Sequence, residues 1–192
     1  LYGEEGARAT TRSELDPVRG RFCTPWPGRL TCTDAQGRVW ASAALPDAGC
    51  GHGLFDAQGR LLLHCGRNLY LLAVDGGALQ RVPIHEPLDD ARDLRELAVD
   101  SRGVVWLAEE QGLRLIDPDT GASRLLVAAR TKGLLAANDG RYMLMSDNQQ
   151  GMWLAANGQG VTRASLRPPL FRHWQPPPGE DGQPVNSHVR AL

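Results

Sequence analysis

The 192-residue sequence lacks several features that would point directly to a partner. It has no excess of one charge, because 21 Lys and Arg residues oppose 22 Asp and Glu residues, so nucleic acid is not an expected partner. Its longest apolar runs, such as Leu69–Val74, have the length of a strand and fall far short of the roughly 18 residues that suggest a membrane span. We therefore expect a globular region that makes no membrane contact of its own.

Motifs for catalysis and metal binding are also absent. The histidines show no H-E-x-x-H spacing, the cysteines show no C-x-x-C, and neither a G-x-S-x-G turn nor a phosphate-binding loop occurs. We therefore predict no metal, no cofactor and no catalytic residue in this region. Two weak candidates for ligand binding remain. They are His52, whose glycine neighbours in the predicted loop "CGHG" would permit close approach, and Trp174, in the Pro-rich connector 167–186.

The four cysteines leave two interpretations open. Their spacings of 9, 18 and 15 residues match no zinc pattern. In an exported domain they would permit two disulfides, and the pairing Cys23–Cys32 with Cys50–Cys65 is one of three connectivities. The other interpretation is that they are buried, unpaired thiols, because cysteine packs as a small apolar residue.

A short pattern, D-x-x-G-x-x-W, recurs along the chain with variations. In each copy an apolar strand ends in Asp, a turn with Gly follows, and a second strand usually carries Trp. The Asp can bond the turn backbone, the Gly permits a positive φ, and the Trp suits the space between stacked sheets. The copies are Asp34, Gly37 and Trp40; Asp56 and Gly59, with Leu62 in the Trp position; Asp100, Gly103 and Trp106; and Asp147, Gly151 and Trp153.

This repeat predicts an all-β fold, a β-propeller built from four-stranded antiparallel blades. The last three Asp residues are 44 and 47 positions apart, the length of one blade. Asp34 and Asp56 are only 22 apart, so residues 1–50 are expected to be irregular. Blade-like units are predicted at about 51–87, 94–128 and 141–175, with a further blade starting at 186–192. We expect one region that is part of a longer propeller; a compact five-bladed ring is the alternative.

The segment "LRELAVDSRGVVWLAEEQGLRLIDPDTGASRLL" resembles the two-component-regulator propeller repeat. The usual form of that repeat has Asp, Gly, Trp, Gly, Leu, Asp and Gly where this chain has Asp100, Gly103, Trp106, Gly112, Leu113, Asp117 and Gly121. The resemblance extends more weakly over about residues 30–192, and "NSHVRAL" at 186–192 is similar to the start of a repeat. The usual W-I-G-T is replaced by Trp106-Leu-Ala-Glu and by Trp153-Leu-Ala-Ala.

The resemblance implies a periplasmic sensor module of a membrane-anchored bacterial signalling protein, such as a hybrid histidine kinase. Its partner would be a small-molecule or protein ligand, and a homodimer is one option. Any kinase or cyclase activity would belong to a separate output domain, so this region is expected to be no enzyme. The alternative is a propeller enzyme of the streptogramin lyase or gluconolactonase type, which would need polar groups that converge on the central channel.

Overall fold

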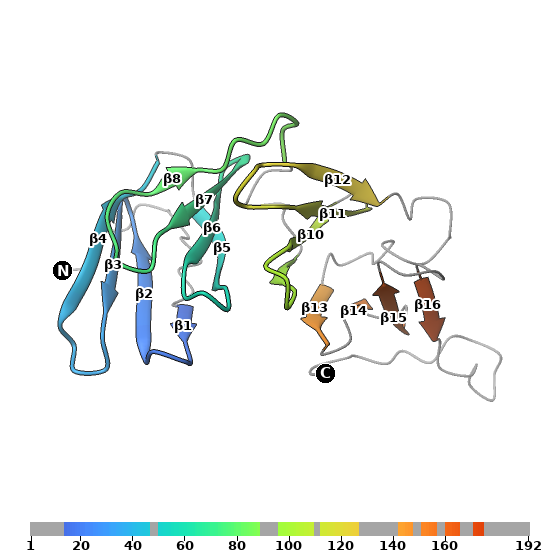
Figure 1. Ribbon diagram of the computed structural model, residues 1–192, viewed down its shortest axis with the longest axis horizontal. Helices are drawn as coiled ribbons and strands as arrows, with labels where there is room; N and C mark the ends of the chain where they lie inside the picture. The colour runs from blue at the N-terminus through green and yellow to red at the C-terminus, as the bar shows by residue number, and fades with distance from the viewer. Residues whose placement is uncertain are drawn as a thin grey trace, which may run out of the picture. The chain divides into compact units, whose positions relative to one another are not determined.

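The fold consists of β-strands joined by tight turns (Figure 1). The computed structural model describes residues 14–46, 50–88, 96–109, 112–126, 142–147, 151–156, 160–165 and 171–174. Within these ranges every regular element is a strand, and no helix has the length and apolar character needed to cross a membrane. The all-β prediction is confirmed.

The strands form four antiparallel sheets of four strands each, and we call each sheet a blade. In every blade the strands are adjacent in chain order, as in a propeller blade. Blade 1 contains β1 (Glu14–Asp16), β2 (Arg21–Trp26), β3 (Arg29–Thr33) and β4 (Val39–Ala44), and blade 2 contains β5 (Cys50–Phe55), β6 (Leu61–Cys65), β7 (Asn68–Leu72) and β8 (Gln80–Arg81). Blade 3 contains β9 (Glu96–Val99), β10 (Val105–Glu109), β11 (Gly112–Ile116) and β12 (Ser123–Leu126), and blade 4 contains β13 (Tyr142–Ser146), β14 (Gly151–Ala156), β15 (Gly160–Ser165) and β16 (Phe171–Trp174).

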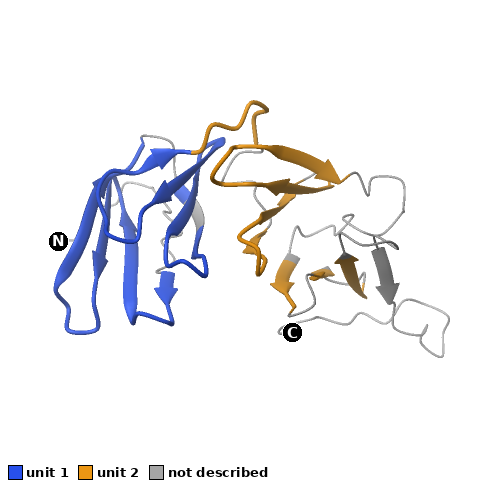
Figure 2. Ribbon diagram, in the orientation of Figure 1, with its two compact units in different colours: residues 1–81, 90–92 blue, residues 82–89, 93–192 orange. Residues whose placement is uncertain are grey.

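The chain divides into two compact units with two blades each (Figure 2). The first unit comprises residues 1–81 and 90–92, and the second comprises residues 82–89 and 93–192. Within each unit the first strands of the two blades lie next to each other, β1 beside β5 and β9 beside β13. This is the arrangement expected where neighbouring blades of a propeller pack face to face.

Alternation along the strands builds the core of the first unit. Successive side chains of a strand point to opposite faces, so Cys23 and Cys32 face inward while Phe22 and Thr33 face outward. The inward residues of blade 1 pack against blade 2. This buried cluster consists of Cys23, Leu30, Cys32, Ala41, Ala43, Leu61 and Leu72.

The core of the second unit is built around Trp106 of β10, which is fully buried. Small residues on the same face make room for its ring, and blade 4 contributes aliphatic side chains to the same cluster. Each large side chain buried in this way stabilises the fold by about 2 to 3 kcal/mol. The cluster consists of Ala98, Trp106, Ala108, Leu113, Leu115, Met152, Leu154 and Ala164.

The expectation that residues 1–50 are irregular is wrong, because blade 1 is a complete sheet between Glu14 and Ala44. In this blade the Asp that ends the first strand, β1, is Asp16. Its carboxylate accepts hydrogen bonds from the backbone N–H groups of Val18 and Arg19 in the turn that leads to β2. The turn "DPVRG" is one residue longer than D-x-x-G, which hides it from the repeat pattern.

The repeat pattern placed the turn of Asp34 and Gly37 between the first and second strands of a blade, and the structure corrects this. Their turn joins the third strand to the fourth, β3 to β4, as the Asp117 turn joins β11 to β12. A tight Asp–Gly turn closes any antiparallel pair, so the motif does not reveal which pair it closes. Trp40 consequently lies on the last strand of its blade, where the guanidinium of Arg21 stacks over its ring at 4.4 Å.

The structure contains two disulfides, Cys23–Cys32 and Cys50–Cys65. Each links directly opposed residues of neighbouring strands, β2 with β3 and β5 with β6. The cysteines are therefore not the buried thiols of the second interpretation. Each blade of the first unit has one covalent cross-link between strands.

We predict that mass spectrometry of the unreduced protein will find two linked peptide pairs. Trypsin cuts after Arg21, Arg29, Arg38, Arg60 and Arg67, so each cysteine lies on its own peptide. Peptide 22–29 should be joined to 30–38, and 39–60 to 61–67. Reduction should lower the free energy of unfolding by about 2 to 4 kcal/mol per disulfide, because the unfolded chain gains freedom. Any other peptide pairing would contradict the structure.

Candidate functional site

The Asp at the end of the first strand of blade 3 organises a small polar cluster. One carboxylate oxygen of Asp100 accepts hydrogen bonds from the backbone N–H groups of Arg102 and Val104, at 2.9 and 3.1 Å. The other accepts from the Arg102 guanidinium at 2.7 Å and from the indole Nε1–H of Trp106 at 3.1 Å. Asp100 thus connects the turn, the second strand and a cation.

Blade 4 contains the same kind of cluster, except that its arginine comes from a different position in the blade. Asp147 accepts hydrogen bonds from the backbone N–H of Gly151 at 2.7 Å and from Trp153 Nε1–H at 3.1 Å. Its cation is Arg163, which reaches it from β15 at 2.8 Å.

In blades 3 and 4 the six-residue spacing thus places the indole within hydrogen-bond distance of the Asp carboxylate. Trp40 has the same spacing from Asp34, but its Nε1–H has no acceptor among the described residues, because the Asp34 turn joins a different pair of strands. The sequence pattern predicted an apolar role for these Trp residues and did not reveal the hydrogen bonds.

Gly151 does not occupy the position of Gly103. It corresponds to Val104, because both residues donate their N–H to the Asp side chain and accept from the Asp backbone. Gly103 has a positive φ of 83°, as the turn requires. At Gly151 the position of a Cβ is occupied by neighbouring side chains. A Cβ on Gly151 would lie 2.6 Å from Asp147 Oδ2 and 2.7 Å from Arg163 Nη2.

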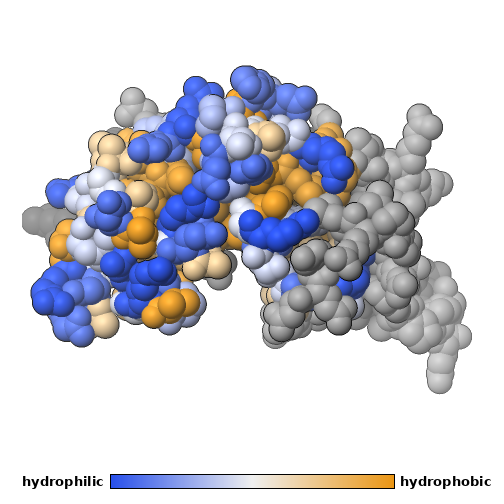
Figure 3. All heavy atoms as spheres, viewed as in Figure 1, coloured by the Kyte–Doolittle hydropathy of each residue, from blue (hydrophilic) through white to orange (hydrophobic). Residues whose placement is uncertain are grey.

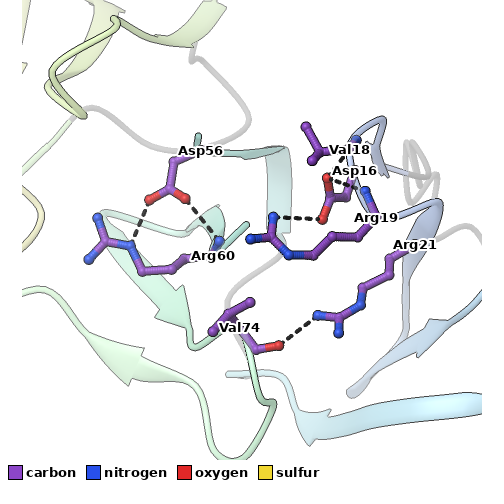
Figure 4. A network of polar contacts seen from close by, with 7 residues as sticks. All are labelled: Asp16, Val18, Arg19, Arg21, Asp56, Arg60 and Val74. Carbon is purple, nitrogen blue, oxygen red and sulfur yellow. Dashed lines mark hydrogen bonds and ion pairs between the residues drawn. The ribbon is translucent and has the colours of Figure 1, made fainter. Parts of the chain in front are cut away.

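The turns of the first unit pair their carboxylates with arginine as well (Figure 4). Asp56 is paired with Arg60 at 2.7 Å and Asp16 with Arg19 at 3.5 Å. The Arg19 guanidinium lies against Gly59 of the neighbouring blade, where it would collide with any Cβ. Arg21 donates to the Val74 carbonyl at 2.7 Å and so connects the two blades again.

These ion pairs neutralise the acidic turns. Each of these five carboxylates has an Arg partner, so their turns offer little net charge to a cation, and the described residues contain no group of three potential metal ligands. The arginines come from different sequence positions relative to their Asp, which is why the repeat pattern did not show them. The pairs are Asp16–Arg19, Asp34–Arg38, Asp56–Arg60, Asp100–Arg102 and Asp147–Arg163.

Burial and hydrogen bonding act in opposite directions on the pKa of Asp100. Burial alone would raise this pKa, but the hydrogen bonds from Arg102, Trp106 and Val104 outweigh it and lower the pKa below its usual value. At Asp34, in an exposed turn, the pKa is lowered chiefly by the backbone N–H of Arg38. Both carboxylates are ionised near neutral pH.

We predict that Asp100→Ala will lower the free energy of unfolding by about 2 to 3 kcal/mol, because the buried Trp106 indole N–H loses its acceptor. Asp34→Ala is the matched control, since Asp34 closes a similar turn without a Trp partner, and its loss should be clearly smaller. Urea unfolding of both variants measures the difference. Equal losses would show that the indole contact contributes nothing.

The pH dependence of the same variant provides a second readout. Because the folded pKa of Asp100 lies below its unfolded value of about 3.9, its contribution is complete above that pH. The contribution is lost as the pH falls through the folded pKa. The difference between the wild-type protein and Asp100→Ala should therefore shrink below about pH 4, and a constant difference down to pH 2 would contradict the assignment.

A second polar cluster lies at the opposite edge of blade 3, where β10 leads into β11. Arg114 is nearly buried, with 9% of its side chain exposed, and Glu109 is buried to 3%. Arg114 Nε donates to Glu109 at 2.7 Å, and Nη1 donates to Glu86 at 2.6 Å. Glu86 comes from the connector between blades 2 and 3, and 68% of its side chain is exposed. Burial alone would lower the pKa of Arg114, but both carboxylates raise it above its usual value.

The buried cation and the exposed carboxylate of this cluster should contribute differently to stability. We predict that Arg114→Met will cost about 3 kcal/mol of stability, because it removes the cation next to the buried Glu109. Glu86→Gln should cost less than about 1 kcal/mol, because that carboxylate is exposed. Thermal unfolding of the two variants tests this order, and a larger loss for Glu86→Gln would reverse the assignment.

The structure places the two sequence-predicted ligand candidates in different units. His52 lies in β5 rather than in a loop, where the pairing with β6 shifts between Cys50 and Gly53. Trp174 is the last residue of β16, opposite Val161, so the predicted connector 167–186 includes a strand. The side chains of both candidates, and the predicted further blade at 186–192, lie outside the described residues.

Comparison with known proteins shows the fold alone. No family model matches the chain, and no curated protein matches it. The extracellular domain assigned to the hybrid two-component system BT3049 of B. thetaiotaomicron is similar, with a TM-score of 0.59 at 12% identity, over 87% of this chain and 24% of that chain. The corresponding domain of BT4673 from the same organism has a TM-score of 0.56 at 15% identity, over 83% of this chain and 23% of that chain.

Two lyase structures are also similar to this chain, with slightly lower TM-scores. The virginiamycin B lyase of Staphylococcus aureus, solved with quinupristin as an inactive His-to-Ala variant, has a TM-score of 0.53 at 14% identity. The match covers 85% of this chain and 58% of the lyase. The chain spans little more than half the length of a second streptogramin B lyase structure, which it matches over 54% of that chain. These similarities support a propeller fold, of which the described residues form four blades.

Proposed function

We propose that this chain is part of the extracytoplasmic sensing domain of a bacterial membrane signalling protein of the two-component type. The observation that carries the proposal is the fold shared with extracellular domains of hybrid two-component systems. Both disulfides support it, because such bonds form and persist in oxidising compartments such as the periplasm. The role of the region is to bind a small-molecule or protein ligand and to pass the event to an attached output domain.

The chemistry of the described residues fits a binding role better than a catalytic one. The Asp residues of the five turns listed above are paired with arginine. Arg114 is paired with the buried Glu109 and with a second carboxylate, that of Glu86. Of the described histidine side chains, His64 is buried within blade 2, and His85 lies exposed in the connector that belongs to the second unit. In this proposal any catalytic activity belongs to the attached output domain.

The similarity to streptogramin lyases favours a second candidate, a propeller lyase. The protein solved with quinupristin owes its inactivity to the loss of one His. A lyase would need a His at the mouth of its central channel, held beside other polar groups. Among the described histidine side chains, His64 is fully buried in blade 2 and His85 is exposed in the connector.

We predict that the protein in its natural host will carry both disulfides and will have no lyase activity. Thiols should be blocked in intact cells before lysis, followed by mass spectrometry of the two linked peptide pairs. Free thiols at all four cysteines would place the region in a reducing compartment and overturn the proposal. Conversion of quinupristin by the purified protein would favour the lyase, whereas a membrane-spanning segment and a signalling domain in the same gene would favour the sensor.

A further inference from the structure

The surface of the described residues is mixed in polarity. On the face drawn in Figure 3, hydrophilic residues in blue and hydrophobic residues in orange lie interspersed. A ligand site in such a surface depends on individual polar groups of unusual burial rather than on a broad patch of one kind. Arg114 of β11 is such a group, because only 9% of its side chain is exposed.

The ion pair of Arg114 and Glu86 differs from the ion pairs of the Asp turns in which partner is buried. In each of the five turn pairs described above, the carboxylate is less exposed than its arginine. Between Arg114 and Glu86 this order is reversed, since the exposed fractions are 9% for the arginine and 68% for the glutamate. The turn pairs therefore enclose an anion, whereas this pair encloses a cation and covers it with a carboxylate at the surface.

The guanidinium of Arg114 has more donors than the described residues use. Of the N–H groups that an arginine carries, Nε donates to Glu109 and Nη1 donates to Glu86. Nη2 has no hydrogen-bond acceptor among the residues that the structure describes. A carboxylate that bridges Nη1 and Nη2 makes two parallel hydrogen bonds to the guanidinium, where Glu86 makes one.

Glu86 can leave this position without a change in the fold. The connector is fixed on both sides by buried residues, with Val82 before Glu86 and Leu88 after it. Residues 85–87 between these two anchors are exposed. A rotation of the Glu86 side chain into solvent therefore releases Nη1 of Arg114 while both anchors stay in place.

The charges around Arg114 already accommodate a second carboxylate. Arg114 and the buried Glu109 neutralise each other, and Glu86 adds one negative charge. A ligand carboxylate that replaces Glu86 leaves this total unchanged, so no further charge has to be buried. Leu107 of β10 lies directly opposite Arg114 in the sheet, and apolar surroundings strengthen the attraction between the guanidinium and an anion.

We propose that Arg114 recognises the carboxylate of a small-molecule ligand, and that Glu86 occupies the place of this carboxylate until the ligand binds. The proposal names a ligand class for the sensing function and rests on that function. The ligand displaces Glu86 because it makes two hydrogen bonds to the guanidinium instead of one.

The experiment is equilibrium dialysis of the polypeptide, as its gene encodes it, against radiolabelled acetate, succinate and benzoate. At least one of these carboxylates should bind to a single saturable site. Glu86→Gln should bind it about three- to fivefold more tightly, because an exposed ion pair no longer competes for Arg114. Asp119→Asn is the matched control, since it removes an equal charge from an exposed turn of the same blade and should leave the affinity unchanged.

A change at the arginine itself should have the opposite effect. Arg114→Lys keeps a positive charge beside Glu109 but cannot form two parallel hydrogen bonds, so it should bind the carboxylate about tenfold more weakly. If this variant does not fold, phenylglyoxal, which modifies arginine side chains, tests the same contact in Glu86→Gln. A saturating concentration of the carboxylate should protect Arg114 from modification in peptide mass spectrometry and leave the exposed Arg124 of β12 unprotected.

Three results would overturn the proposal. They are the absence of saturable binding of all three probes to Glu86→Gln, equal affinities of Glu86→Gln and the wild-type protein, and equal modification of Arg114 with and without the carboxylate. If both disulfides are present in intact cells, these results refute the carboxylate site and leave the sensing function in place. Free thiols in intact cells together with carboxylate binding would refute the sensing function and leave the site.

Discussion

The fold depends on one interaction, the carboxylate of an Asp at the end of the first strand of each blade. The strands are only 2 to 6 residues long, and a hairpin of such strands is marginal in water by itself. At Asp100 a single carboxylate accepts hydrogen bonds from two turn N–H groups, one guanidinium and one indole. The turn, the second strand and the core Trp of blade 3 are thereby held in one geometry.

The same interaction explains why the most regular feature of the sequence is not a functional site. Asp100 and Asp147 hold their Trp partners, and the arginines compensate their charge. The chemistry that differs between blades lies elsewhere, for example in the cluster of Arg114, Glu109 and Glu86 on the opposite edge of blade 3. Since one scaffold is shared by extracellular domains of two-component systems and by lyases, function must be decided by such non-repeating groups.

Much of the scaffold could be predicted from sequence, and the errors have physical causes. The spacing of Asp56, Asp100 and Asp147 indicated four-stranded blades because each blade must repeat the same turn. Blade 1 was missed because its first turn, at Asp16, has one extra residue, while the Asp34 turn closes a different strand pair. In the candidate site, the sequence pattern identified the Asp and Trp residues but not their hydrogen bonds. It also missed the arginines, because they do not lie at one fixed distance from the Asp along the sequence.

The sequence by itself determined the all-β class, the blade length and the identity of the turn residues, because strand alternation and turn chemistry are local properties. The tertiary structure alone decided which cysteines pair, because Cys23 and Cys32 become opposed only when β2 and β3 are in register. It likewise brought Arg163 to Asp147, 16 residues away, and Glu86 to Arg114, 28 residues away. Such contacts depend on how strands and connectors meet in space, which no local pattern encodes.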